Sequence, residues 1–377
     1  MSIIAVDQIT DSNGGNSTTV NGTTPTIYNT IGRNRVINGA MEINQRLFSV
    51  VDVIGNGYTV DRFNTYYNYG SVNCTVTQES DAPSGFYKSL KIAYSSGTYT
   101  AGNNGYIMNR HMIELNNLLD TAYGTNDAKD LTFSFWLKAK RTGTFTLNVL
   151  RSNTSSQRQI SRQGQITSAD TWQKFIFTIP GDTDGQWANI ASPNNVGIFF
   201  DIVANVDVTW TTGTLNTSWN NNVTGNRAPG QTNFIQSSGD YFSVTGIQVE
   251  VGSVATEFER RPYGTELALC QRYYEKSYNT GTVPGTGLTG GWASFASPTT
   301  STECAPCLNF MVNKRVVPTM TVYNAVTGAS GAAYRANDAA SIGLTLSYIG
   351  DTGVGNAYLA SGSVTVYYFH WVAVAEL

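Results

Sequence analysis

The chain has 377 residues, of which 41% are hydrophobic, 12% aromatic and only 13% charged, and its net charge is −3. This slightly acidic balance leaves no basic face for nucleic acid, and no apolar run reaches the roughly 18 residues that a bilayer-spanning helix needs. The length suits two domains with an extension, and the composition favours short strands and turns over long helices.

Residues 1–34 predict an N-terminal extension. The first ten residues, MSIIAVDQIT, lack the basic start and apolar core of a secretory signal. The following stretch, DSNGGNSTTVNGTTPT, is too polar to fold alone. Two hypotheses remain for this extension: a disordered tail or linker, or an extended arm that becomes ordered against a partner.

Residues 35–261 predict one all-β domain, because roughly 8–12 short apolar segments are bounded by turn residues. In LTFSFWLKAK, Leu131, Phe133, Phe135 and Leu137 share one side, and Trp136 falls on the other. Despite this position, we expect Trp136 and Trp172 to be core residues. The segment VGIFFDIVANVDV is apolar on both faces over its first half and should lie centrally in a sheet.

A strand, a charged segment and a helix end this domain. Phe242–Val251 alternates with a period of two, and Gly246 indicates a bulge or bend. The charged segment is Glu257–Arg261, after which Thr265 and Glu266 predict the cap of a short helix. Leu267, Cys270 and Tyr274 would form the inner face of that helix. We therefore predict a domain seam, with residues 262–277 as a helical linker.

This seam, VTGIQVEVGSVATEFERRPYGTELALCQRYYEKS, resembles the junction in tail-fibre and related virion fibre proteins of tailed bacteriophages. RVINGAMEINQR, YTVDRFNTYYN and DLTFSFWLKAKRTGTFTL follow the same family pattern, so the resemblance covers most of residues 35–277. It implies a carbohydrate-binding-module-like jelly roll that opens with strands in the first two stretches and is followed by a small distal domain. It also implies that residues 1–34 attach the fibre to other virion proteins.

Residues 278–377 predict a small β-rich C-terminal domain, which resembles the distal domain of the same phage proteins. Its last strand, GSVTVYYFHWVAVAEL, has no polar face along its length. Such a strand needs a second covering surface, which either a compact sandwich or a homotrimer would supply.

The candidate glycan contacts are aromatic and polar residues in loop-like surroundings, because sugars stack on aromatic rings and hydrogen-bond to polar side chains. Packing of a loop onto the sandwich is the alternative for each of them. The candidates are Trp187, Trp210, Trp219, Arg227 and Trp292.

The sequence gives little material for catalysis or metal binding. Asp201 and Asp207 are six residues apart and would share a face of a regular strand, as a hydrolase pair requires. A turn, capping or cation-binding role is the preferred interpretation. Cys304 and Cys307 form a single CxxC, where a structural zinc site needs a second pair, so we predict thiols or a labile disulfide. No cofactor is expected, apart from an unassigned structural Ca²⁺.

The leading hypothesis is a non-enzymatic phage virion protein, assembled in the host cytoplasm as a homotrimeric tail fibre. Its exposed loops would contact host-surface polysaccharide by multivalent weak binding, without membrane insertion. A capsid-bound head fibre or decoration protein is the second hypothesis, and a glycan depolymerase is the third.

Overall fold

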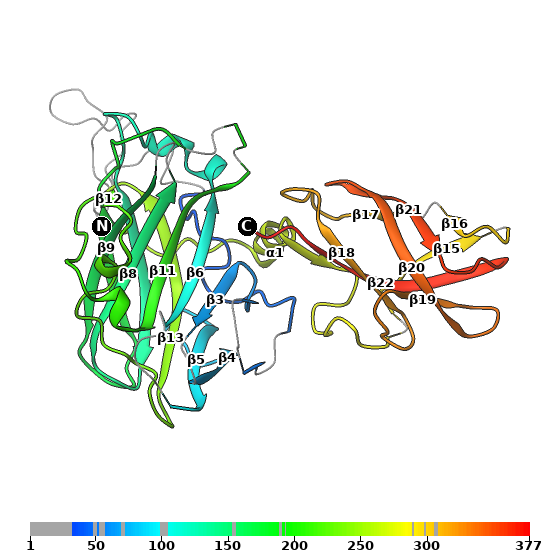
Figure 1. Ribbon diagram of the computed structural model, residues 1–377, viewed down its shortest axis with the longest axis horizontal. Helices are drawn as coiled ribbons and strands as arrows, with labels where there is room; N and C mark the ends of the chain where they lie inside the picture. Colours follow the sequence, from blue (N-terminus) through cyan, green and yellow to red (C-terminus); the bar gives the residue numbers. More distant parts are fainter. Residues whose placement is uncertain are drawn as a thin grey trace, which may run out of the picture.

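The structure is a computed structural model with two β-rich domains joined by a short helix (Figure 1). None of the helices in the described residues is long and apolar enough to cross a membrane. Of the predicted arm, only the last three residues belong to the described part of the chain. The structure describes residues 32–47, 51–52, 57–68, 72–98, 105–152, 156–187, 191–192, 194–288, 290–297, 299–304 and 308–377.

The first domain consists of two antiparallel sheets, which confirms the predicted jelly-roll β-sandwich. In sheet order, the six-stranded sheet contains β1 (Val51–Asp52), β4 (Asn73–Glu79), β5 (Ser89–Ser96), β13 (Tyr241–Val251), β7 (Leu131–Ala139) and β10 (Gln173–Ile179). The seven-stranded sheet contains β12 (Asn220–Asn221), β9 (Gln157–Ile166), β8 (Gly143–Ser152), β11 (Val196–Val206), β6 (Tyr106–Glu114), β3 (Phe63–Asn68) and β2 (Gly57–Tyr58). Short 3₁₀ turns are η1 (Leu115–Asn117), η2 (Leu119–Thr121), η3 (Val208–Trp210) and η4 (Thr224–Asn226).

The core lies between these two sheets and is rich in phenylalanine. Phe133 of β7 meets Phe200 of β11 edge to face, with ring centroids 5.4 Å apart. The predicted inner side of β7 is fully buried, so its alternation was interpreted correctly. The prediction for β11 is also confirmed, because this strand lies between β6 and β8 and is buried along almost its whole length.

A histidine is buried in this core. The His111 ring packs between Phe63 and Phe200, at centroid distances of 4.8 and 5.7 Å. Burial, together with repulsion from the Arg62 guanidinium, lowers the pKa of His111 well below 6.5. His111 is therefore neutral in the folded protein at mildly acidic pH.

This buried histidine predicts acid sensitivity. Below a pH of about 6.5 the unfolded chain binds a proton at His111 that the folded protein does not bind, so stability falls with pH by up to about 1.4 kcal/mol per pH unit. The variant His111→Leu should show a flatter dependence of unfolding free energy on pH, measured by urea titration between pH 7.5 and 5. Equal slopes for variant and wild type would contradict the prediction.

The predicted opening strand at residues 35–46 is not a regular strand. The Arg35 amide donates to the Val249 carbonyl at 2.8 Å, and the Ile247 amide donates to Gly39 at 2.9 Å. The segment therefore lies along β13. It cannot continue as a strand, because Asn38 and Met41 have φ angles of 61° and 60°.

The linker helix α1 (Tyr263–Gln271) is present, but its predicted cap was wrong. The helix begins two residues before Thr265, directly after Pro262, whose fixed φ angle suits a helix start. The Pro262 carbonyl accepts the amides of both Thr265 and Glu266. As predicted, Cys270 is buried and Leu267 packs on the same cluster, which also contains Ile37 of the first domain.

The second domain is built around a nine-stranded sheet. In sheet order its path is β14 (Tyr274–Lys276), β22 (Thr365–Val374), β19 (Ala332–Arg335), β20 (Ala340–Ile349), β21 (Gly353–Leu359) and β16 (Glu303–Cys304). Off this path, β15 (Ala293–Ser297) and β18 (Thr319–Asn324) pair with β22, and β17 (Leu308–Asn309) pairs with β21. Because β14 pairs with β22, the end of the predicted linker belongs to this sheet.

The doubly apolar strand β22 is covered within a single chain. Its first face, with Phe369 and Trp371, contributes to the domain core. On its second face, the His370 ring stacks on Tyr278 at 3.9 Å, and the Tyr368 ring lies 4.6 Å from Trp292. This covering removes the apolar-surface argument for self-association, and the homotrimer remains a prediction.

Candidate functional site

The outer face of the six-stranded sheet carries an aromatic side chain of β7. Trp136 is partly exposed, so the expectation that it belongs to the core was wrong. Its outward position follows from the alternation of β7, because its neighbours Phe135 and Leu137 are fully buried on the other face. Across the sheet, Trp136 lies beside Thr245 of β13 and Lys174 of β10.

A glycine opens the surface next to this tryptophan. Gly246 has a φ angle of 62°, and the register of β13 against β7 shifts between Thr245 and Gln248. The predicted bulge is therefore confirmed. A Cβ atom on Gly246 would lie 2.6 Å from Phe86 Cζ and 3.0 Å from Trp136 Cδ1, so both rings lie directly over the glycine.

These rings line a groove with a volume of about 450 Å³. Phe258 forms a further aromatic wall and meets Phe86 edge to face at 5.0 Å. The Arg260 guanidinium lies 4.8 Å from the Phe86 ring centroid and 5.5 Å from that of Phe258. The other lining residues are Ser84, Gly85, Ser134, Lys174, Gly246 and Glu257. The groove thus combines aromatic walls with a polar rim.

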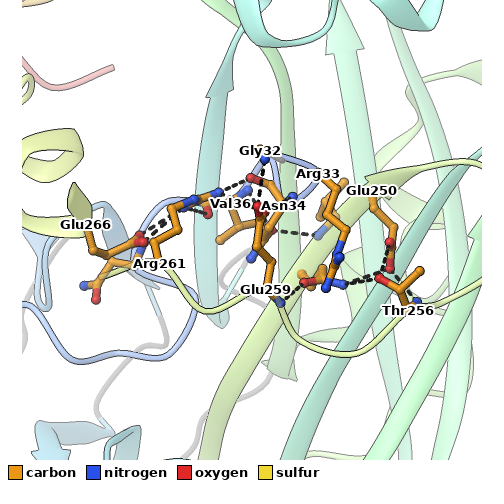
Figure 2. A network of polar contacts seen from close by, with 12 residues as sticks. Gly32, Arg33, Asn34, Val36, Glu250, Thr256, Glu259, Arg261 and Glu266 are labelled. Atoms are coloured by element: carbon orange, nitrogen blue, oxygen red, sulfur yellow. Dashed lines mark hydrogen bonds and ion pairs between the residues drawn. The ribbon is translucent and has the colours of Figure 1, made fainter. Parts of the chain in front are cut away.

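The charged segment predicted at the domain seam holds one wall of this groove in place. The Glu259 carboxylate accepts the amides of Gly32 and Asn34, each at 2.7 Å. Arg261 donates to the Asn34 and Val36 carbonyls and forms an ion pair with Glu266 at 3.1 Å (Figure 2). Anchored at residues 259 and 261, the segment places the intervening Arg260, and the adjacent Phe258, at the groove.

A second network fixes the start of the same segment. The Glu250 carboxylate accepts the amide of Thr256 at 2.9 Å and its hydroxyl at 2.7 Å (Figure 2). The Arg33 side chain donates to the Glu257 carbonyl at 2.7 Å. A small cavity lies beside the first network, where Glu259, Arg261 and Glu266 line it, and its space of about 30 Å³ is enough for one water molecule. The seam network is therefore structural, and the groove is the candidate site.

Two of the five residues predicted to contact glycan are buried, and those two predictions were wrong. Trp187 and Trp210 are each 4% exposed. Trp187 stacks on Tyr123 at 5.7 Å, and Trp210 packs in a cluster with Met108. The loops that carry them fold back onto the sandwich, so neither indole face is open to a sugar.

The other three predicted residues are partly exposed but lie apart from the groove. Trp219 packs on the core and donates from its indole nitrogen to the Pro180 carbonyl at 2.7 Å. The Arg227 guanidinium lies 4.7 Å from the Trp210 ring and donates to Asn222. The Trp292 ring packs at a tilt against Tyr368 in the second domain, with an interplanar angle of 39°. Glycan contact at these three positions stays a prediction.

The two carboxylates considered for catalysis are engaged in structural contacts. Asp201 is fully buried and accepts two hydrogen bonds from Arg110, at 2.6 and 2.9 Å. Asp207 caps η3 through the Thr209 amide and also accepts the Gly105 amide. The strand is not regular between them, because its register against β6 shifts between Val203 and Asn205.

No metal site is apparent in the described ranges, where no group of three or more His, Cys, Asp and Glu residues could hold an ion. Cys304 is buried, and Cys307 lies outside the described residues. The unassigned Ca²⁺ stays a prediction.

Sequence reasoning missed Phe86 and Phe258, which together with Trp136 make the groove. Phe86 lies in a turn next to Tyr87, and Phe258 lies in the charged segment, so neither belongs to the periodic pattern that identifies a strand. The available signals were the outward position of Trp136 in β7 and the glycine bulge in β13. These two signals predict an aromatic side chain over an open surface, but not its other walls.

No protein-family model matches the sequence, and no curated protein sequence is similar to it. Among solved structures, the tailspike protein 4 enzymatically active domain of bacteriophage CBA120 has a TM-score of 0.29 and 12% identity, over 58% of this chain and 21% of that one. A protein of Bacteroides thetaiotaomicron described as sugar-binding has a TM-score of 0.33 and 11% identity, over 58% of this chain and 99% of that one. A family 11 carbohydrate-binding module of a Clostridium thermocellum cellulase has a TM-score of 0.28 and 10% identity, over 54% of this chain and 98% of that one. Likenesses this low say nothing about ligand or activity.

Proposed function

We propose that this protein binds glycans in the groove formed by Phe86, Trp136 and Phe258. The observation that carries the proposal is the outward Trp136, which lies in a groove with two further aromatic walls. Ligand sites typically have about 300–1,000 Å³, and the groove of about 450 Å³ lies in this range. Its three aromatic side chains offer apolar surface, and its polar lining, Ser84, Ser134, Lys174, Glu257 and Arg260, offers groups that can orient a ligand. A sugar ring presents an apolar face to aromatic rings and hydroxyl groups to the rim.

We further propose that the binding serves a tailed-phage virion, in which the chain is a tail fibre that touches host-surface polysaccharide without cleaving it. The resemblance of residues 35–277 to phage fibre proteins supports this role. Residues 1–34 would attach the fibre to other virion proteins. Assembly as a homotrimer would raise avidity at the host surface, because several weak sites would bind together.

Replacing Trp136 by Ala tests the groove. We expect binding of wild-type protein to at least one polysaccharide in a panel of bacterial surface polysaccharides, measured by isothermal titration and by gel retardation. Trp136→Ala should weaken that binding by at least about tenfold, which corresponds to the roughly 1.4 kcal/mol expected for a central aromatic contact. Reducing ends measured in the same samples should not increase.

Trp219→Ala and Trp292→Ala are the matched controls, because both remove a partly exposed tryptophan outside the groove. Their affinities should stay close to that of the wild type. If only the Trp292→Ala variant lost affinity for the polysaccharide, the binding site would lie in the second domain. Equal affinities for Trp136→Ala and wild type would overturn the proposal.

A further inference from the structure

The groove lies beside a strip of basic side chains on the outer face of the six-stranded sheet. Lys91 of β5 and Lys138 of β7 flank Ser243 of β13 in one row across the sheet. The next row places Trp136 beside Lys174. Arg260 stands over the aromatic walls on the other side of the groove. Positive charge therefore extends from the groove along the sheet, although the whole chain has a net charge of −3.

The acidic side chains near this strip compensate only part of its charge. Asp81 forms an ion pair with Lys138 at 2.8 Å. Burial raises the pKa of Asp81, but the hydrogen bonds from Lys138 and Trp172 and the charges of Lys138 and Lys91 outweigh burial and lower it overall. Glu257 is the only acidic residue among the groove's described lining.

Both cations at the groove itself are available to a ligand. Arg260 reaches its nearest carboxylate, that of Glu42, only at 3.9 Å, and its side chain is 50% exposed. Lys174 is exposed, and within the described residues it forms no ion pair. These two side chains border the aromatic walls, so an anionic group on a ring stacked there would meet a cation on either side.

We propose that the glycan recognised in the groove is an acidic polysaccharide. One of its sugars would stack on Trp136, and carboxylates of the polysaccharide would bind Lys174 and Arg260. The chain of sugars then continues across the sheet face toward Lys138 and Lys91. This inference rests on the proposed glycan binding and adds the class of ligand. A single-stranded nucleic acid carries the same sign of charge and could also stack on Trp136, so the test below includes it as the competing occupant.

The test compares acidic polymers with their own neutral forms. Polygalacturonate, alginate, hyaluronate and polysialate would each be titrated before and after chemical reduction of their carboxyl groups. We expect at least one polymer to bind at least about tenfold more tightly in its acidic form, because charge-assisted hydrogen bonds to Arg and Lys are the stronger ones. That preference should shrink as salt rises, since these side chains are exposed.

Variants separate the claim of glycan binding in the groove from the claim that the glycan is acidic. Trp136→Ala should lose binding to acidic and neutral forms alike, whereas Lys174→Gln combined with Arg260→Gln should lose only the preference for the acidic form. Arg335→Gln is the control for a lost surface charge, because Arg335 pairs with Asp338 in a hairpin of the second domain. Its preference should equal that of the wild type.

Each remaining outcome counts against one claim. Equal binding of acidic and reduced forms, abolished by Trp136→Ala, overturns the acidic ligand and leaves glycan binding standing. Binding to none of these polymers or their reduced forms, nor to any member of the surface-polysaccharide panel, overturns glycan binding itself. Tighter binding of a single-stranded oligonucleotide than of every polysaccharide overturns the inference in favour of nucleic acid.

Discussion

Replacing Arg62 by Met is expected to lower the free energy of unfolding by about 3–5 kcal/mol, because it leaves a buried carboxylate without its main partner. Arg62 is 1% exposed and donates to the Glu376 carboxylate and, at 2.7 Å, to the Met112 carbonyl. Its guanidinium also lies 3.5 Å from the Tyr273 ring centroid. Arg46 holds the other Glu376 oxygen at 2.7 Å.

Because Glu376 belongs to the second domain and both arginines to the first, the same variant should loosen the domain interface. Urea unfolding would measure the stability, and limited proteolysis of residues 262–277 would report loosening. Arg335→Met is the matched control, since the ion pair of Arg335 with Asp338 lies at the surface, where such pairs change stability little. A loss below about 1 kcal/mol for Arg62→Met would show that Arg46 alone satisfies Glu376.

A double-mutant cycle isolates this ion pair from the other contacts of Arg62. Glu376→Leu, alone and combined with Arg62→Met, completes the cycle. Both variants that lack Glu376 also lose its contact with Arg46, so this loss cancels, and Glu376→Leu should cost less stability in the Arg62→Met background than in the wild type. If the two single effects add within about 0.5 kcal/mol, the loss in Arg62→Met comes from Met112 and Tyr273 rather than from the pair.

Sequence reasoning worked wherever the period of a strand decides which side chains are buried. The alternation in β7 and β13 identified the core face, and Gly246 identified the bulge between them. The burial of β11 on both faces followed from its continuous apolar run. These features depend on neighbours within one strand, which the sequence displays directly.

The groove could not be predicted, because its walls come from three separate parts of the chain. Phe86 belongs to a turn before β5, Trp136 to β7, and Phe258 to the charged segment. Only the register of β7 against β13 and the anchoring of Glu259 and Arg261 bring them together. For the same reason Trp187 looked exposed: nothing local shows that its loop folds back onto Tyr123.

The seam gives the charged segment a role that composition alone did not indicate. Glu259 and Arg261 bind the backbone of residues 32–36, so the described start of the first domain is tied to the segment that leads into α1. Phe258 and Arg260, which form one wall of the groove, belong to the same charged segment. The proposed ligand contacts at Phe258 and Arg260 would therefore lie next to the connection between the two domains.

Gly246→Ala is expected to disable the groove and to destabilise the first domain. The left-handed backbone at φ 62° costs an alanine roughly 1–2 kcal/mol. The added methyl group would lie 2.6 Å from Phe86 Cζ, so Phe86 must move away, which adds about 1–3 kcal/mol of packing loss. With Phe86 displaced and Trp136 crowded, affinity for the glycan should fall by at least about tenfold.

Gly230→Ala provides the matched control, because Gly230 has a φ angle of 78° but nothing within 4 Å of an added Cβ. This variant should show the backbone cost alone and bind glycan like the wild type. Calorimetric titration and urea unfolding of both variants separate the two effects. If Gly246→Ala loses stability but keeps full affinity, the rings over the glycine are not the surface that the sugar touches, and binding must be sought at Trp219, Arg227 or Trp292.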